Sequence, residues 1–160
     1  DWETHQINDY AWELQTLLST CSATLKQAGP NPHGKPYKVS HTIWPGVHSP
    51  ETIASLKDCV DNINLMTYGA ESGDDLQSYA ESYYEAGFPY EKMIGGVESE
   101  IDYPENGGPD TQDSIQKKCD FAKENNLAGM FSWRLDNDMR TAGSPPTFQV
   151  ADWLYEAMSV

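Results

Sequence analysis

The apolar residues of this chain form stretches with helical spacing that alternate with short runs typical of β-strands. The first helical stretch extends from about Asp9 to Ala28, and Gly29-Pro30 ends it. Four more helices are predicted from spacing and end signals: after Ser49-Pro50, from Ser72 or Asp74 to Gly87, from Thr111 to about Asn126, and from about Phe148 to Met158. Four strands are predicted between them, at residues 37–43, 63–68, 92–97 and 128–133.

The alternation of strands and helices indicates parallel βα units. Asp1-Trp2-Glu3 has the pattern of the end of one more strand, with both carboxylates on one face, since side chains two apart point the same way. Glycine-rich strands without a dinucleotide-binding fingerprint argue against a Rossmann domain. We therefore expect an α/β fold of the (β/α)8 TIM barrel type, which needs about 250 residues and eight units. Because the sequence has about half of these units, we expect the N-terminal half of the barrel to be absent from this chain.

The composition is that of a globular domain or of a part of one. Of 160 residues, 38% are hydrophobic, and no apolar run approaches the roughly 20 residues of a membrane helix. The net charge of −15 argues against nucleic acid or an anionic membrane surface as a partner and fits a neutral ligand. Cys21, Cys59 and Cys119 fall within predicted helices without metal-ligand spacing. We expect them to be small buried thiols, with a Cys21–Cys59 disulfide left open, and we expect neither a metal nor a cofactor.

The residues with the most chemistry follow the predicted strands. At successive strand ends stand Asp1 and Glu3, then Trp44, then Met66 and Tyr68, then Glu98 and Glu100, and finally Trp133, Arg134 and Asp136. In a barrel these ends meet at one face, where the active site lies. Aromatic rings stack on the faces of sugar rings, and carboxylates bind hydroxyl groups. Two carboxylates as close as Asp1 and Glu3 repel each other, so that one holds a proton at neutral pH, as a glycosidase requires.

The motifs at these strand ends resemble those of glycoside hydrolase family 18, the chitinases and related endo-β-N-acetylglucosaminidases. Asp1-Trp2-Glu3 matches the last positions of that family's Asp-x-x-Asp-x-Asp-x-Glu motif on the fourth barrel strand. Met66-Thr67-Tyr68-Gly69 resembles its Met-x-Tyr-Asp on the sixth strand. Residues 128–133 resemble its eighth strand, and residues 135–138 resemble the acidic segment after that strand. The resemblance implies that residues 1–160 extend from the end of strand 4 through helix 8 of a catalytic barrel.

The resemblance also implies a mechanism, the substrate-assisted retaining cleavage of β-1,4 bonds next to N-acetylglucosamine. Glu3 would be the general acid and later the base for water, whereas the substrate's own 2-acetamido group would attack the anomeric carbon. Asp1 would orient the acetamide, and the Tyr68 hydroxyl would hydrogen-bond its carbonyl. The substrate would further contact Trp133, as the apolar floor, and Met66, Trp44 and Asp136.

Two features depart from the family pattern. Gly69 stands where the family usually has an aspartate, which removes a contact to a hydroxyl or acetamide and implies a changed substrate or weaker activity. The upstream aspartates of the fourth-strand motif are absent from the chain, so the sequence does not say how Asp1 and Glu3 are tuned.

Two other functions stay open. A two-carboxylate retaining glycosidase would use Glu3 together with Glu98 or Glu100 at about 5 Å separation, and it would not need a 2-acetamido group. A solvated acidic loop is the simpler interpretation of Glu98 and Glu100. A non-catalytic, lectin-like barrel would bind N-acetylglucosamine sugars without cleaving them; Gly69 favours this interpretation, and the intact acid Glu3 counts against it.

The expected partner is an oligo- or polysaccharide that contains N-acetylglucosamine, and neither nucleic acid nor a membrane. We expect a monomer, and the resemblance implies an extracellular, secreted protein. Lone histidines are more often structural, so His5 and His41 receive no role here. A half barrel has two open sheet edges. We therefore expect residues 1–160 by themselves to have low stability and no turnover.

Overall fold

The computed structural model describes residues 4–69, 75–101 and 108–159. Four strands form one parallel sheet in chain order: β1 (Ser40–Ile43), β2 (Asn62–Leu65), β3 (Met93–Glu98) and β4 (Gly129–Trp133). The helices between and around them are α1 (Ala11–Gln27), α2 (Pro50–Ser55), α3 (Asp75–Glu85), α4 (Gln112–Glu124) and α5 (Gln149–Ser159). Short 3-10 helices occupy His5–Asn8, Tyr90–Lys92 and Leu135–Asn137. The predicted alternation of parallel strands and helices is confirmed.

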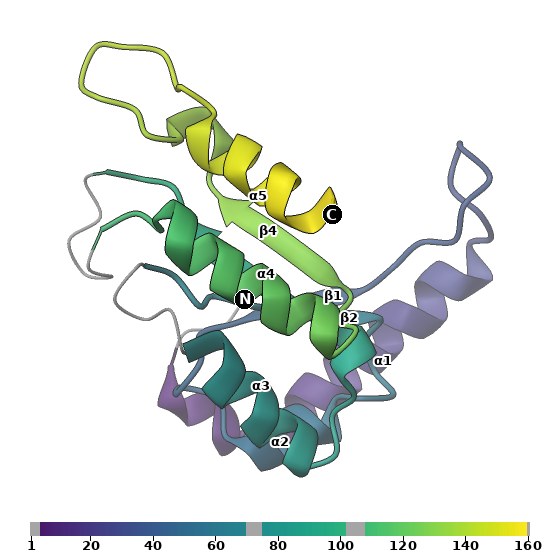
Figure 1. Cartoon of the computed structure of the whole chain (residues 1–160). Coiled ribbons are helices and arrows are strands. Elements are labelled where there is room, and N and C mark those ends of the chain that lie inside the picture. Colours follow the sequence, from purple (N-terminus) through teal and green to yellow (C-terminus); the bar gives the residue numbers. More distant parts are fainter. Residues whose placement is uncertain (1–3, 70–74, 102–107, 160) are drawn as a thin grey trace.

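The helices line up along one side of the sheet. In Figure 1, α2, α3, α4 and α5 follow one another in the same order as the strands that they connect or follow. Each βα connection therefore returns the chain to the same end of the sheet, which is the arrangement of consecutive units in a (β/α)8 barrel.

The helix starts follow from local hydrogen bonding. Ser49 caps α2, and its hydroxyl oxygen accepts a bond from the backbone N–H of Thr52, while Pro50 occupies the first turn. Thr111 and Ser114 form a reciprocal capping box at the start of α4. Both starts are as predicted. The cap of α3 that was expected at Ser72 or Asp74 lies outside the described residues.

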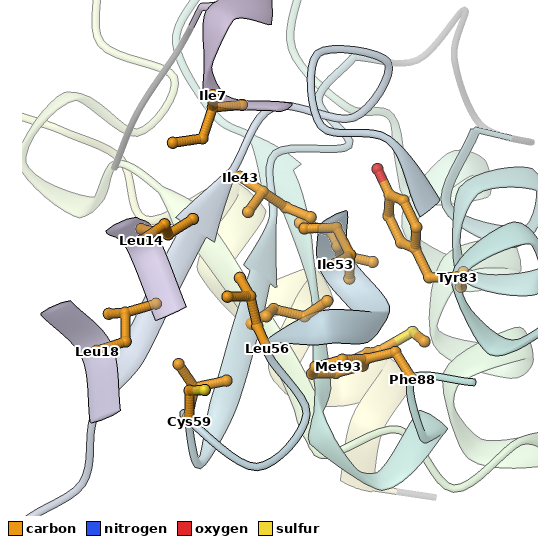
Figure 2. Close-up of a cluster of buried hydrophobic side chains, with 14 of the residues drawn as sticks. Ile7, Leu14, Leu18, Ile43, Ile53, Leu56, Cys59, Tyr83, Phe88 and Met93 are labelled. Carbon is orange, nitrogen blue, oxygen red and sulfur yellow. The ribbon is translucent and has the colours of Figure 1, made fainter. Parts of the chain in front are cut away.

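The core lies between the sheet and the helices. The strand residues that point toward the helices define the outer face of the sheet: they include Ile43, Ile63, Leu65, Met93 and Val97, all completely buried. Figure 2 shows how side chains from several helices and loops converge on this face, among them Leu14, Leu18, Ile53, Leu56 and Phe88. A second cluster joins Val97 to α4 and α5 through Ile115, Cys119 and Val150. Apolar burial thus accounts for the one-sided layer of helices.

The opposite side of the sheet is the inner face, defined by the residues that alternate with the outer set. Along β1 and β2 it presents Ser40, Thr42 and Asn64, whose side chains are half-buried or exposed. The Asn64 amide donates to the hydroxyl of Thr42 at 3.2 Å. Within the described residues no helix covers this face, although parallel sheets are usually covered on both sides.

Strand bounds and cysteine environments differ from the sequence-based expectations. The strand predicted at residues 63–68 is observed as β2, which ends at Leu65. The first strand begins at Ser40 rather than at Tyr37, because its pairing with β2 begins at Ser40. Cys59 is buried in the turn after α2 rather than within a helix, and Cys21 is exposed on α1 rather than buried. All three cysteines are free, so no Cys21–Cys59 disulfide forms. Only Cys119, on α4, has the predicted combination of helix and burial.

Candidate active site

The carboxyl ends of the four strands lie side by side at one end of the sheet, which we call the carboxyl edge. Most of the predicted site residues lie there. Trp44 follows β1, Met66 and Tyr68 follow β2, Glu98 ends β3, and Trp133 ends β4. The register pairs Glu98 directly with Trp133. Because alternate residues share a face, these side chains belong to the inner face. Asp1 and Glu3, the expected catalytic carboxylates, lie outside the described residues.

Tyr68 is held over the inner face by a contact that only glycine permits. Its ring meets the ring of Phe131 edge to face, with 6.1 Å between the ring centroids. A Cβ at Gly96 would come within 2.7 Å of the Phe131 ring, 2.8 Å of the Tyr68 ring and 2.6 Å of the Leu65 carbonyl oxygen. The glycine in β3 thus lets the two rings close over the sheet, which fixes the side on which the Tyr68 phenol lies.

Glu98 is a buried carboxylate at the centre of the edge. Its side chain is fully buried, and its Oε1 accepts the backbone N–H of Ser99 at 2.9 Å and of Glu100 at 2.8 Å. The backbone N–H of Ser99 also donates to the carbonyl of Trp133 at 2.7 Å. The simpler interpretation of a solvated acidic loop is therefore wrong for Glu98, because the turn after β3 folds back onto the carboxylate.

Glu100 takes part in a charged cluster with residues that follow β4. Its Oε1 accepts from Arg134 Nε at 3.1 Å and from the side-chain amide of Asn137. Arg134 also lies 3.5 Å from a carboxylate oxygen of Asp136, whose side chain is largely exposed. Glu100 is buried rather than solvated, which is a second correction. Asp136 thus lies on the exposed rim of this charged cluster, in contact with Arg134.

Two tryptophans at opposite sides of the sheet leave much of their surface uncovered. Trp44, after β1, is 43% exposed, and Trp133, at the end of β4, is 46% exposed. Met66 and Tyr68 lie between them along the edge and are half-buried. Large exposed aromatic rings are candidates for contacts with a ligand or a partner. Here they flank an edge that also carries Tyr68 and Glu98.

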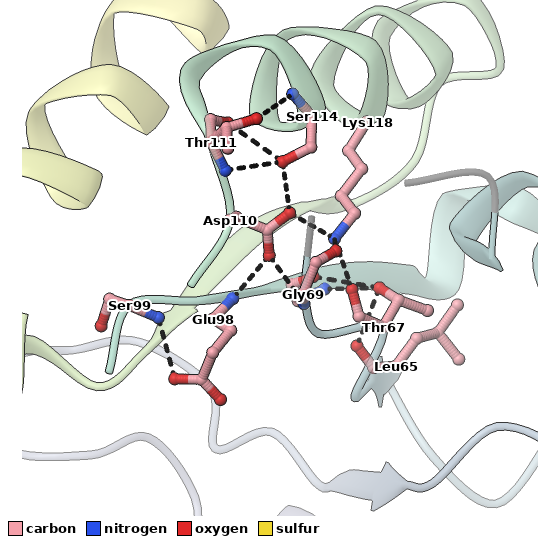
Figure 3. A network of polar contacts seen from close by, with 10 residues as sticks. Leu65, Thr67, Gly69, Glu98, Ser99, Asp110, Thr111, Ser114 and Lys118 are labelled. Carbon is pink, nitrogen blue, oxygen red and sulfur yellow. Dashed lines mark hydrogen bonds and ion pairs between the residues drawn. The ribbon is translucent and has the colours of Figure 1, made fainter. Parts of the chain in front are cut away.

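A buried ion pair that the sequence analysis did not single out ties the strand ends to α4. Lys118 Nζ and Asp110 Oδ1 are 2.7 Å apart, and both side chains are fully buried. Asp110 also accepts the backbone N–H of Glu98 and of Gly69, as Figure 3 shows. A signal was present in the sequence: Lys118 lies in the same stripe of α4 as Ile115, Cys119 and Ala122, the face that a helix buries.

His41 does not line the edge. It lies on the outer face of β1, buried against His48, with 3.3 Å between their Nε2 atoms. Burial lowers the pKa of each imidazole to about 4, and the neighbouring His48 adds to this effect at His41. This position lies on the helix side of β1, away from the inner face. The side chain of His5 lies outside the described part of the chain.

Residues 4–69, 75–101 and 108–159 can also be considered for metal sites, membrane-spanning helices and grooves. They contain no group of three or more histidine, cysteine or acidic side chains arranged to hold a metal ion. No helix in these ranges has the length and apolar character needed to cross a bilayer. A shallow polar groove runs between α3 and α4, with Gln77, Glu81 and Lys117 along it, but it lies on the helix side of the sheet.

The arrangement of strands and helices is that of part of a (β/α)8 barrel, and solved structures with the same fold are chitinases and chitinase-like proteins. A class V chitinase from Nicotiana tobaccum superposes with a TM-score of 0.68 at 13% identity, over 94% of this chain and 64% of that chain. A GH18 chitinase from Cycas revoluta, in complex with (GlcNAc)3, gives 0.66 at 16% identity, over 99% of this chain and 65% of that chain.

YKL-39, crystallised in the presence of chitooligosaccharides, gives a TM-score of 0.73 at 13% identity, over 96% of this chain and 66% of that chain. No family model and no curated protein sequence matches the chain. The chain thus spans slightly less than two thirds of these three structures. The resemblance to glycoside hydrolase family 18 is confirmed at the level of the fold, and the expected partial TIM barrel is confirmed with it.

Proposed function

We propose that this chain is the carboxyl-terminal half of the catalytic barrel of a chitinase-like glycosidase that cleaves β-1,4 bonds next to N-acetylglucosamine. The observation that carries the proposal is the inner face at the carboxyl edge of the sheet. There Tyr68, Glu98 and two exposed tryptophans gather in a fold shared with chitinases. Catalytic residues of TIM barrels come from this edge.

The proposed mechanism assigns a task to each residue. Glu3 protonates the glycosidic oxygen of the leaving sugar while the substrate's 2-acetamido oxygen attacks the anomeric carbon and forms an oxazolinium ion. Glu3 then takes a proton from the water that opens this ion, so the two steps together retain the configuration. Asp1 orients the acetamide and stabilises the positive charge that develops on it. Tyr68, whose ring lies over the sheet where Gly96 leaves room for it, donates its phenolic hydrogen to the acetamide carbonyl. Trp133 is the apolar floor under the reacting sugar.

The uncovered inner face supports the assignment to half of a barrel. Parallel sheets are normally covered on both faces, and in a closed barrel the inner residues pack against those of the other strands. The solved chitinases of the same fold are longer, since this chain covers 64% of the Nicotiana enzyme. We propose that three further βα units and the fourth strand complete the barrel. A monomeric, secreted protein acting on a polysaccharide is part of the same proposal.

Gly69 gives the proposed site one distinctive feature. Its N–H donates to Asp110 at 3.1 Å, and its carbonyl accepts from Lys118 at 3.4 Å. The backbone at this position is therefore well anchored, while the side chain that the family places here is missing. We propose that the site makes one contact fewer to the substrate and turns over more slowly than family members with the aspartate.

The test is hydrolysis of a chromogenic chitobioside by the natural full-length protein and by its Glu3→Gln variant. We expect turnover to fall by about 10³-fold or more in Glu3→Gln, because amide nitrogen cannot supply the proton, while binding of N-acetylglucosamine oligomers persists. Equal turnover in both forms would remove Glu3 from the mechanism. No turnover in either form, with oligomers still bound, would favour a lectin-like barrel.

A second candidate is a two-carboxylate glycosidase with Glu98 as its second carboxylate. The observation in its favour is that Glu98 is a buried carboxylate on the inner face, paired in register with Trp133. Against it, one of its oxygens already accepts two backbone N–H groups. Glu100 is the weaker choice because its Oε1 already accepts hydrogen bonds from Arg134 and Asn137. This candidate predicts that sugars without a 2-acetamido group are cleaved equally well.

A further inference from the structure

Two buried charges lie next to the proposed site without belonging to its chemistry. Asp110 comes just before α4, and Lys118 lies two turns into it. Their side chains are completely buried, and they contact each other at 2.7 Å. A buried ion pair is poor evidence for added stability, because removing two charges from water offsets most of their attraction. The groups that the pair contacts are therefore more informative than its presence.

The contacts of the pair go to the ends of two neighbouring strands. Asp110 Oδ2 accepts the backbone N–H of Glu98 at 2.7 Å and of Gly69 at 3.1 Å. Its Oδ1 accepts from Lys118 and from the hydroxyl of Ser114, each at 2.7 Å. Lys118 donates in turn to the carbonyl of Thr67 at 2.6 Å. Figure 3 shows this network between the start of α4 and the two strand ends.

These contacts enclose Tyr68, which the proposed function needs, and they also reach the backbone of Glu98 on the neighbouring strand. Tyr68 stands between Thr67 and Gly69, and both of its neighbours are bound by the ion pair. Glu98 is fixed through its own backbone N–H. The Asp110 carboxylate thus joins the segment after β2 to the end of β3. The rings of Tyr68 and Phe131 lie close by, over Gly96.

We propose that Asp110 and Lys118 are positioning residues, which fix the Tyr68 phenol for glycoside cleavage by joining the chain on both sides of Tyr68 to the end of β3. The inference rests on the proposed function in so far as it concerns cleavage. Neither residue touches the substrate. They act through the backbone, and a displacement of the order of 1 Å at a reacting group lowers the rate by about 10²-fold.

The opposite end of the sheet offers matched controls. Lys92, just before β3, donates to two backbone carbonyls, those of Lys57 at 2.6 Å and Val60 at 2.9 Å. Asp61 accepts the backbone N–H of Val39 at 2.7 Å. These side chains tie loops at the amino ends of the strands, far along the sheet from Tyr68. They make the same kinds of bond without reaching the proposed site.

The experiment measures kcat and KM for a chromogenic chitobioside in the natural full-length protein and in five variants. These are Asp110→Asn, Lys118→Met, the double variant of the two, and the controls Asp61→Asn and Lys92→Met. We expect kcat to fall roughly 10- to 100-fold in the first three, with KM within about 3-fold of the wild type, and both parameters to be unchanged in the controls. The double variant leaves no unpaired buried charge, so it serves if a single variant does not fold.

Backbone hydrogen exchange gives a second measurement that needs no turnover. We expect the N–H groups of Gly69 and Glu98 to exchange faster by about 10-fold or more in Asp110→Asn, while that of Leu65 stays protected. Folded variants with wild-type kcat, or with unchanged exchange at Gly69 and Glu98, would overturn the positioning role and leave the proposed function intact. Absence of turnover in the wild type would overturn the proposed function, and exchange would still decide whether the pair orders both strand ends.

Discussion

The two faces of the sheet differ in burial and in polarity. The outer face is completely buried along β1, β2 and most of β3, under apolar side chains from the helices. The inner face carries mainly small, polar and aromatic residues together with Met66 and Ile94, and many of them are half-buried or exposed. The outer face thus supplies the free energy that orders the strands. The inner face keeps its chemical groups available, which is why the candidate site lies there.

Adjacent glycines in β3 show the same contrast within one strand. A Cβ at Gly95 would meet the flexible ends of Leu76 and Met130, both at 2.8 Å, on the outer face. At Gly96 it would meet the backbone carbonyl of Leu65 and two aromatic rings on the inner face. The first glycine allows close packing of a helix, whereas the second makes room for the Tyr68 ring.

The largest expected difference between the faces concerns Leu65, the last residue of β2, and Met66, which follows it. Leu65 is completely buried on the outer face, so Leu65→Ala should lower the free energy of unfolding by about 3–5 kcal/mol through lost burial and a residual cavity. Met66→Ala, on the inner face, should cost less than about 1.5 kcal/mol because Met66 is only half-buried. Urea denaturation of both variants measures this. Equal losses would mean that the inner face is as tightly packed as the outer one.

The buried histidine pair should make the outer side sensitive to acid. His41 and His48 have a pKa near 4 in the folded protein and about 6.5 when unfolded, so the folded state favours the neutral rings. The contribution of the two neutral rings to the free energy of unfolding should be fully present above pH 6.5. It should decline as pH falls toward 4, by up to about 1.4 kcal/mol per pH unit for each histidine.

The measurement is the denaturation midpoint at several pH values between 7 and 5, a range above the titration of most carboxylates. The control is His41→Gln, in which we expect a smaller decline because one of the two titrating rings has been removed. A wild-type midpoint that is constant over this range would contradict the lowered pKa values.

Changing the two glycines of β3 should give a smaller, graded effect. We expect Gly96→Ala to lower the free energy of unfolding by about 2–3 kcal/mol, because a backbone carbonyl and two packed rings cannot all move away. Gly95→Ala should cost about 1 kcal/mol, since flexible side-chain ends can shift. Thermal unfolding provides the comparison. Gly96→Ala should also reduce turnover, whereas a folded variant with full activity would show that the Tyr68 ring position is not required.

The smallest effect on stability should come from the exposed tryptophan of the inner face. Trp133→Ala should change the free energy of unfolding by less than about 1 kcal/mol, yet weaken the binding of chitotetraose by about 10-fold or more. The matched control is Tyr155→Ala on α5, where an aromatic ring is 74% exposed but lies away from the strand ends. Calorimetric titration should find that Tyr155→Ala binds chitotetraose with unchanged affinity. The same loss in both variants would argue against a specific sugar contact at Trp133.

Much of the outer face could be predicted from the sequence, and the reason is local. The apolar spacing of α1, the caps at Ser49 and Thr111, and the alternation of strands with helices all depend on residues close in the chain. Strand lengths depend on more distant residues. The first strand is shorter than residues 37–43 because pairing with β2, rather than composition, decides where it starts.

The inner face was harder to predict because its groups are defined by distant contacts. Glu98 and Glu100 have the sequence of a solvated acidic loop, yet a backbone turn and Arg134, more than thirty residues later, bury them. Lys118 resembles an ordinary charged position of a helix, although it lies on the buried stripe. The edge residues Trp44, Met66, Tyr68 and Trp133 were located correctly, since the end of a parallel strand is a local feature. Their catalytic and binding roles remain predictions.

We propose above all that the inner face serves a reaction in which the substrate's own acetamido group is the nucleophile. The most direct measurement compares the hydrolysis of a chromogenic chitobioside and of the matching cellobioside, which has a hydroxyl at carbon 2, by the natural full-length protein. We predict turnover of the chitobioside and at least about 10³-fold slower turnover of the cellobioside, because the attacking group is missing. Comparable rates, with loss of activity in Glu98→Gln, would contradict the account and favour a carboxylate nucleophile on the protein.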